Sequence, residues 1–242
     1  MNAPEHCRRT KPGQAFTLVE LLIIIAFLAV LAAVLLPVLE RQSSVGDHVS
    51  CAANIKQICL SFIVWSLDNN THFPMQVPVA NGGTLELVAG GMVYPHFLVL
   101  SNELSTPLIL HCWTDERRPR TAKFSDLSDR NLSYFLNVDA IVEPRSDHYR
   151  EGASVLLGDR NITNRTPEGS RLVPLTKANR IAWTKDLHSG KGHLGFADGR
   201  VGLFTNRIAG VARAVGTDGT VAADVSTAIQ IPDGVTNRLA VP

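Results

Sequence analysis

The densest group of metal-ligating side chains in the sequence is Asp186, His188, His193 and Asp198. Two imidazoles and a carboxylate can bind zinc or iron. However, Asp198 precedes Gly199, and an aspartate before a glycine is a preferred turn pair, so it has a structural reason to be there. We therefore expect these residues to serve the fold, and the sequence predicts no metal site and no cofactor.

The sequence offers no convincing nucleophile. Cys112 follows His111 in an apolar stretch that favours a strand, where neighbouring side chains point to opposite faces. Ser154 and Ser189 lack a G-x-S-x-G context. Neither a P-loop nor a G-x-G-x-x-G fingerprint is present. The sequence thus predicts no catalytic residue, and the protein is not expected to be an enzyme.

A β-hairpin is predicted around Asp198-Gly199, between strands at 193–197 and 200–204. A two-residue type I′ turn there would pair Ala197 with Arg200 and set the register of both strands. Because side chains alternate with period two, this register puts four apolar residues on one face of the hairpin. They are Leu194, Phe196, Val201 and Leu203.

The most apolar segment runs from Leu21 to Leu39 without a charged or strongly polar residue. At about 1.5 Å per residue, its 19 residues span roughly 28 Å as a helix, close to the thickness of a bilayer core. A buried core helix and a cleaved signal are the alternatives. The run is longer than a signal core and has no small-residue cleavage site after it, which favours a retained membrane helix.

The charges that flank this helix predict its orientation. Three cations, Arg8, Arg9 and Lys11, precede the helix, whereas Glu40 and Arg41 cancel after it. The positive-inside rule then places the N-terminus in the cytoplasm and the following chain across the membrane. Glu20 lies at the start of this apolar run, directly before Leu21: it either reaches the headgroups or neutralises a positive charge from another chain.

Residues 15–22, Ala-Phe-Thr-Leu-Val-Glu-Leu-Leu behind a short basic leader, resemble the signal of type IV prepilins and type II secretion pseudopilins. The resemblance implies that a prepilin peptidase cuts between Ala15 and Phe16 and methylates the new amine. It also implies that Glu20, the fifth mature residue, meets the amine of a neighbouring subunit. Pro37 falls where pilin helices commonly carry a proline, whereas Ala15 replaces the usual glycine.

Further motifs resemble a large group of pseudopilin-like proteins. His188, nine intervening residues and Asp198-Gly199 match its H-X9-DG signature. Residues 51–57, Cys-Ala-Ala-Asn-Ile-Lys-Gln, are similar to its C-x-N-N-L-K-Q, and residues 112–115, Cys-Trp-Thr-Asp, to its C-P-x-D. We expect His188 to lie near the hairpin and to hold its loop against the sheet, a structural role.

The predicted fold is α+β and pilin-like, with a long N-terminal transmembrane and spine helix packed on a small antiparallel β-sheet head. An apolar stripe at three- and four-residue spacing continues the helix past the membrane: Cys51, Ile55, Ile58, Cys59 and Phe62. The predicted parts are a cleaved leader (1–15), the helix (16–67), a head (68–208) and a C-terminal extension (209–242) that either adds short edge strands or is mobile. Strands are expected at 108–112, 132–138 and 154–157, and a helical turn at 101–106.

Three cysteines would remain after the leader, with Cys7, is removed. Cys51 and Cys59 lie about 12 Å apart along one helix, too far to bond, so an intramolecular disulfide would join the helix to Cys112. The resemblance favours Cys51 as the partner of Cys112, because Cys59 stands where the family usually has glycine.

The expected function is a pseudopilin-like structural subunit of a type II secretion or type IV pilus-like filament in the inner membrane, with its head in the periplasm. Its partners would be prepilin peptidase and other pseudopilin subunits. The formal net charge of +1 argues against a nucleic-acid partner. The alternative is a single-pass periplasmic binding or envelope protein that does not polymerise.

Overall fold

The computed structural model describes residues 17–142, 154–163, 171–175, 182–206, 212–215, 221–224 and 237–242. The chain divides into two compact units, Met1–Val45 and Gly46–Pro242. The second unit, which we call the head, combines helices with an antiparallel sheet, so the α+β class is confirmed.

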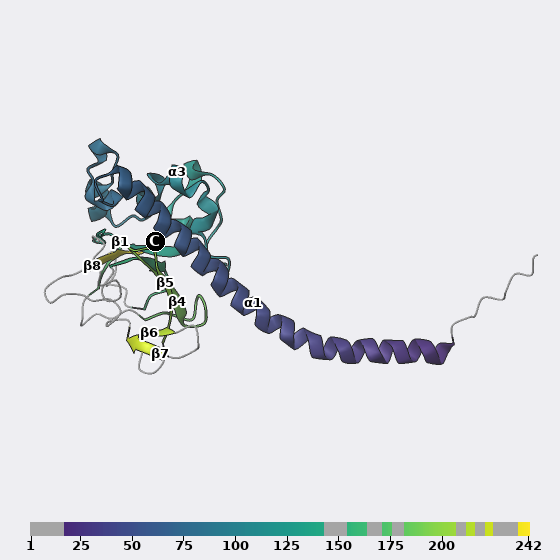
Figure 1. Ribbon diagram of the computed structural model, residues 1–242. Helices are drawn as coiled ribbons and strands as arrows, with labels where there is room; N and C mark the ends of the chain where they lie inside the picture. Colours follow the sequence, from purple (N-terminus) through teal and green to yellow (C-terminus); the bar gives the residue numbers. More distant parts are fainter. Residues whose placement is uncertain are drawn as a thin grey trace, which may run out of the picture. The chain divides into compact units, whose positions relative to one another are not determined.

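The helix α1 (Leu18–Asp68) is followed by short helices and then by the strands (Figure 1). The short helices are η1 (Pro74–Gln76), η2 (Val79–Asn81), η3 (Leu85–Gly90), α2 (Tyr94–Leu98), α3 (Ser101–Leu104), η4 (Pro107–Leu110), η5 (Phe124–Asp126) and η6 (Asp129–Asn131). The strands are β1 (Tyr134–Asn137), β2 (Val155–Asp159), β3 (Leu172–Leu175), β4 (Lys191–Phe196), β5 (Val201–Asn206), β6 (Ala212–Val215), β7 (Val221–Asp224) and β8 (Asn237–Ala240).

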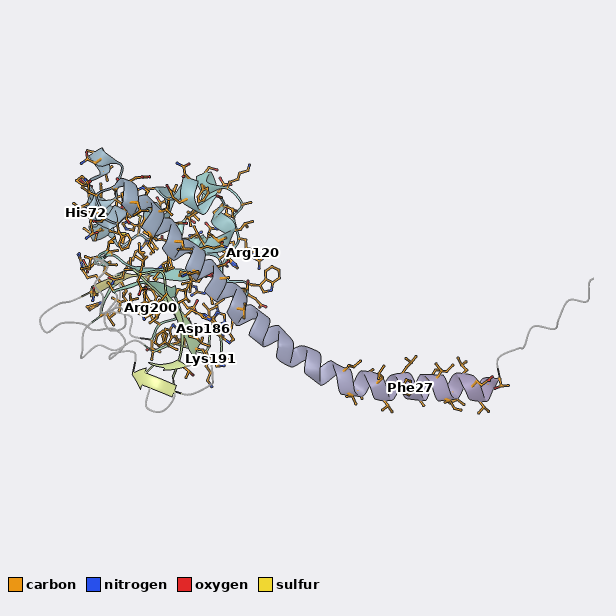
Figure 2. All side chains as sticks on the ribbon, viewed as in Figure 1. Phe27, His72, Arg120, Asp186, Lys191 and Arg200 are labelled. Carbon is orange, nitrogen blue, oxygen red and sulfur yellow. A yellow bond between two sulfur atoms is a disulfide. The ribbon has the colours of Figure 1, made fainter. Side chains whose placement is uncertain are left out.

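The first unit contributes an apolar helical segment, Leu18–Leu35. Its side chains are exposed along its whole length, and Phe27, labelled in Figure 2, is one of them. By length and composition the segment could cross a membrane, although a signal sequence has the same properties. The helix continues through Pro37, as predicted.

The part of α1 that belongs to the head carries the predicted apolar stripe, and this prediction is confirmed. Cys51, Ile55, Ile58, Cys59 and Phe62 are completely buried. Figure 1 shows this part of α1 lying across the sheet. A Cβ atom on Gly195 of β4 would lie 2.5 Å from the Cys59 sulfur, so a glycine at this position lets helix and sheet approach closely.

The strands form one antiparallel sheet in the order β3-β8-β1-β2-β4-β5-β6-β7. The last strand, β8, lies in the interior, because it pairs with β1 through Leu136↔Ala240 and with β3 through Leu172↔Ala240. The end of the predicted extension is therefore an interior strand of the head's sheet, whereas β6 and β7 continue the sheet beyond β5.

Apolar residues cover both faces of the sheet. One core contains the α1 stripe together with residues such as Tyr134 and Leu157. A second core includes Phe135, Trp183 and Phe204. The sheet is thus the middle layer between two buried clusters.

The predicted strand at 108–112 is wrong. Pro107–Leu110 forms the 3-10 helix η4, and the Thr106 hydroxyl accepts a hydrogen bond from the Leu108 amide at its start. A threonine cap and a proline in the first turn favour a helical start, which the apolar content of this short run did not reveal. The other expected elements are present, as α3, β1 and β2.

The predicted hairpin forms, but its register differs by one residue. The Phe196 amide donates to the Arg200 carbonyl, and the Gly199 amide donates to the Phe196 carbonyl. The loop therefore has three residues, and Leu194 pairs with Gly202 instead of Leu203. Such loops combine a type I turn with a left-handed residue, here Gly199 at φ 82°.

This shift separates the four apolar residues that were expected to share a face. Leu194 and Phe196 belong to the second core with Phe204. Val201 packs against the core that contains the α1 stripe. The prediction of one shared apolar face is therefore wrong.

Gly199→Val is expected to lower the free energy of unfolding by about 2 kcal/mol, because a β-branched residue is strained at positive φ. Its Cβ would also lie 3.3 Å from the Ile63 side chain. Gly199→Asn is the matched control, since asparagine tolerates the left-handed conformation and should cost less than about 1 kcal/mol. Denaturant unfolding measures the free energy of unfolding of both variants. If both lowered it equally, the positive φ of Gly199 would not explain the effect of Gly199→Val.

Candidate functional site

Of the residues implied in processing and assembly, Ala15 and Phe16 lie outside the described residues, and Glu20 lies in the first turn of α1. The Thr17 amide and hydroxyl donate to Glu20 Oε2 at 2.9 and 2.8 Å, and the Glu20 amide donates back to the Thr17 hydroxyl at 3.3 Å. These bonds form a capping box, so Glu20 also has a local role at the helix start.

The ends of the H-X9-DG motif do not meet. His188 precedes β4, whereas Asp198 and Gly199 follow it, and a six-residue strand is about 17 Å long. Asp186 pairs with Arg117 and Asp198 with Arg200, both near the surface. His188 does lie near the hairpin, as expected, but beside its strand β4 and not at the turn: its ring centroid is 5.1 Å from that of His193.

His188 lies in a backbone turn of unusual conformation. His188, Ser189 and Gly190 have consecutive φ values of 52°, 53° and 81°. A left-handed conformation at a residue with a Cβ costs roughly 1–2 kcal/mol, so the surrounding contacts must hold the turn. Asn161 contributes to these contacts, since its side-chain amide donates to the carbonyls of Thr184 and Leu187.

The described residues bring three histidines together where α1 meets the sheet. The ring centroids of His188 and His193 lie 5.1 Å apart, and those of His48 lie 4.6 Å from His188 and 5.4 Å from His193. One ring nitrogen from each lies within 4.8 Å of the others. We call these residues, with Asp159, the histidine cluster.

Asp159 is the carboxylate of the histidine cluster and is completely buried. Its Oδ2 accepts a hydrogen bond from the His193 amide at 2.7 Å, and it lies 3.0 Å from His193 Nδ1 and 3.7 Å from His188 Nε2. Its Oδ1 is buried and has no hydrogen-bond partner among the described residues. A lone buried carboxylate oxygen is costly and requires an explanation.

The surroundings of His48 favour its neutral form. Burial lowers its pKa to about 4, and the nearby His188, His193 and Lys191 add to this, whereas Asp159 opposes it. A neutral imidazole has a lone pair on one nitrogen. His48 is thus in the protonation state of a metal ligand at pH 7.

A disulfide between Cys51 and Cys112 lies beside the histidine cluster, and it is the pair that the resemblance implied. Their Cα atoms are 5.5 Å apart, and His188 Nε2 lies 3.3 Å from the Cys112 sulfur. Cys59 is a buried free thiol whose pKa burial raises to about 12. A thiol with this pKa is a poor nucleophile near neutral pH.

A buried ion pair joins Asp115 to Arg160, the residue after Asp159. The guanidinium donates to both carboxylate oxygens at 2.6 and 2.7 Å, and the Ser133 hydroxyl donates to Oδ2. Burial alone would raise the pKa of Asp115, but the hydrogen bonds and charge of Arg160 outweigh it and lower the pKa. Asp115 therefore fastens the Cys-Trp-Thr-Asp segment to the end of β2.

The outer-helix motif also makes contacts that attach α1 to the head. The Asn54 side chain donates to the His111 carbonyl at 3.3 Å, and Lys56 Nζ donates to the Gly199 carbonyl at 2.6 Å. Together with the disulfide of Cys51, these contacts attach α1 to the loop that contains His111 and to the hairpin turn at Gly199.

Sequence reasoning missed His48, Asp159 and Arg160. His48 lies three residues before Cys51, which places both on one face of a helix, and this spacing was the available signal. Asp159 and Arg160 close an apolar strand, but their partners lie 34 and 45 residues away in sequence. Partners so far apart in the sequence produce no local spacing pattern from which the contacts could have been predicted.

No family model matches the chain, and no curated protein or solved structure matches it.

Proposed function

We propose that the chain is a pseudopilin-like structural subunit of a type II secretion or type IV pilus-like filament. The observation that carries the proposal is an apolar, exposed helix with a single carboxylate, Glu20, near its start. A carboxylate in a membrane segment usually has a partner, and the α-amine of an adjacent processed subunit would supply it.

The head supports a structural role. Its motif residues Cys51, Asn54 and Lys56 attach the helix to the head. These contacts hold the helix against the head, which is the arrangement expected for a pilin-like subunit. A disulfide agrees with an oxidising compartment such as the periplasm.

The topology proposed for this subunit has a cytoplasmic N-terminus, an inner-membrane helix and a periplasmic head. Its support is the basic leader, with Arg8, Arg9 and Lys11, ahead of the apolar helix. Prepilin peptidase and other pseudopilin subunits are the proposed partners.

The second candidate is a non-polymerising membrane-anchored envelope protein. The capping box favours it, because Thr17 already supplies local hydrogen bonds that account for Glu20 without a second chain. The two candidate functions differ in whether they need the charge on Glu20. Pairing with the amine of another subunit needs the charge, whereas the capping box needs only a hydrogen-bond acceptor.

Processing should remove residues 1–15 and leave a 227-residue chain (242 − 15) that starts with methylated Phe16. Intact-mass and N-terminal analysis of the membrane-extracted protein measures this, with a strain that lacks prepilin peptidase as the control. Ala15→Gly should accelerate cleavage by restoring the residue that the family uses. Recovery of the uncut chain from cells with active peptidase would contradict the proposal.

A further inference from the structure

We propose that His48, His188 and His193 bind a divalent transition metal, with zinc as the best-fitting ion and Asp159 as the carboxylate that orients the imidazoles. The site connects α1, the turn before β4 and β4 itself, while Asp159 comes from the end of β2.

The geometry requires only a small contraction. If three nitrogens lie within 4.8 Å of one another, a point exists within about 2.8 Å of all of them, and a zinc–imidazole bond is about 2.1 Å. Inward shifts of about 0.7 Å per ring would therefore suffice. Side-chain rotations provide shifts of this size without moving the strands.

The buried charge supplies an independent reason for a cation. Asp159 is completely buried. Its Oδ1 and the Nδ1 atom of His48 are buried atoms with no hydrogen-bond partner among the described residues. A divalent ion between the rings would compensate the carboxylate and engage an imidazole lone pair. It would thereby reduce the cost of burying the Asp159 charge and an unpartnered ring nitrogen.

Asp159 also has the placement of a carboxylate that supports a metal-bound histidine. When His193 donates its Nδ1 proton to Asp159 Oδ2, at 3.0 Å, its other nitrogen carries the lone pair. This carboxylate–histidine arrangement orients the ring and increases its basicity toward a metal. Three nitrogen donors suit zinc, and also cobalt as a spectroscopic substitute, better than calcium or magnesium.

A second donor set overlaps the first one. The sulfurs of Cys51 and Cys112 lie close enough to His188 to share a metal with it, but only after the disulfide is reduced, because a thiolate is the ligand. In the oxidised protein only the three imidazoles can bind the metal. The redox state of the sample therefore distinguishes the histidine ligands from the set that contains the two cysteines.

The test uses the full-length, disulfide-bonded chain in detergent, stripped by a chelator and titrated with Co²⁺ and then with Zn²⁺. We expect one ion per chain with the visible absorption of tetrahedral cobalt, and a higher Tm at saturation. His48→Ala should weaken binding more than about 100-fold, and Asp159→Asn about 10–100-fold. His72→Ala is the matched control, because His72 is exposed, and it should bind normally (Figure 2).

The decisive variant is His48→Ala, because the His48 ring is only partly buried and alanine, a good helix former, should leave the helix intact. Absence of cobalt binding, or binding that His48→Ala does not change, would overturn the proposal. Binding that appears only after reduction, with a sulfur-to-cobalt charge-transfer band, would overturn it in favour of the cysteine set.

Discussion

Arg160→Met is expected to lower the free energy of unfolding of the head by about 3–5 kcal/mol, because it leaves Asp115 buried and unpaired. The two side chains are almost completely buried and form a bidentate pair. Denaturant unfolding followed by near-ultraviolet circular dichroism measures the loss.

Two further variants isolate this effect. Asp115→Leu combined with Arg160→Met should unfold within about 1 kcal/mol of the original protein, because an apolar pair replaces both charges. Arg200→Met, which breaks the exposed pair with Asp198, should cost less than about 1 kcal/mol. If Arg160→Met and Arg200→Met lowered the free energy of unfolding equally, burial would not determine how much each ion pair stabilises the head.

The ion pair also predicts how stability depends on pH. The pKa of Asp115 is lower in the folded protein than its ordinary value. The stabilisation that ionised Asp115 contributes is therefore complete above the ordinary pKa of an aspartate. It is lost as the pH falls through the pKa that Asp115 has in the folded protein. The double variant lacks this source of acid sensitivity.

On the proposed function, Glu20→Gln should abolish filament assembly while membrane insertion and the start of the helix stay intact. Glutamine can replace glutamate in a capping box, so the bonds with Thr17 are kept and only the charge is removed. An unpaired amine buried in the assembled membrane segment would cost about 3–5 kcal/mol, enough to reduce subunit addition more than 100-fold. Filament shearing and crosslinking measure assembly, and N-terminal mass shows that processing is normal.

Thr17→Ala is the complementary control, because it removes the hydroxyl of the capping box and keeps the charge. It should assemble. If Glu20→Gln assembles as well as the original protein, the structural-subunit proposal fails and the non-polymerising envelope protein is favoured.

The sequence predicted the elements that depend on local pattern. The stripe of Cys51, Ile55, Ile58, Cys59 and Phe62 repeats with the helical period, and its burial was predictable for that reason. The position of the Asp198-Gly199 turn was predictable from its residue types. Its loop length was not, because aspartate-glycine suits both two- and three-residue loops, and the difference of one residue moves side chains to opposite faces.

The histidine cluster could be predicted only in part. His188 and His193 are close in sequence, and turn chemistry correctly explained Asp198 as part of the loop. The partners that complete the cluster, His48 and Asp159, come from a helix and a strand whose packing the sequence did not specify. Long-range pairing of this kind depends on the whole sheet, which includes the interior position of β8.

The interior position of β8 also affects how the chain folds during synthesis. Asn137 of β1 pairs with Leu239, which is made 102 residues later (239 − 137). At about 5–20 residues per second, β1 waits roughly 5–20 s for this neighbour. Until then, one edge of β1 exposes unpaired backbone groups and can recruit strands from other nascent chains. The helix, the disulfide and the β1–β2 pair can form early, whereas closing the sheet is a late step that follows synthesis of the last strand.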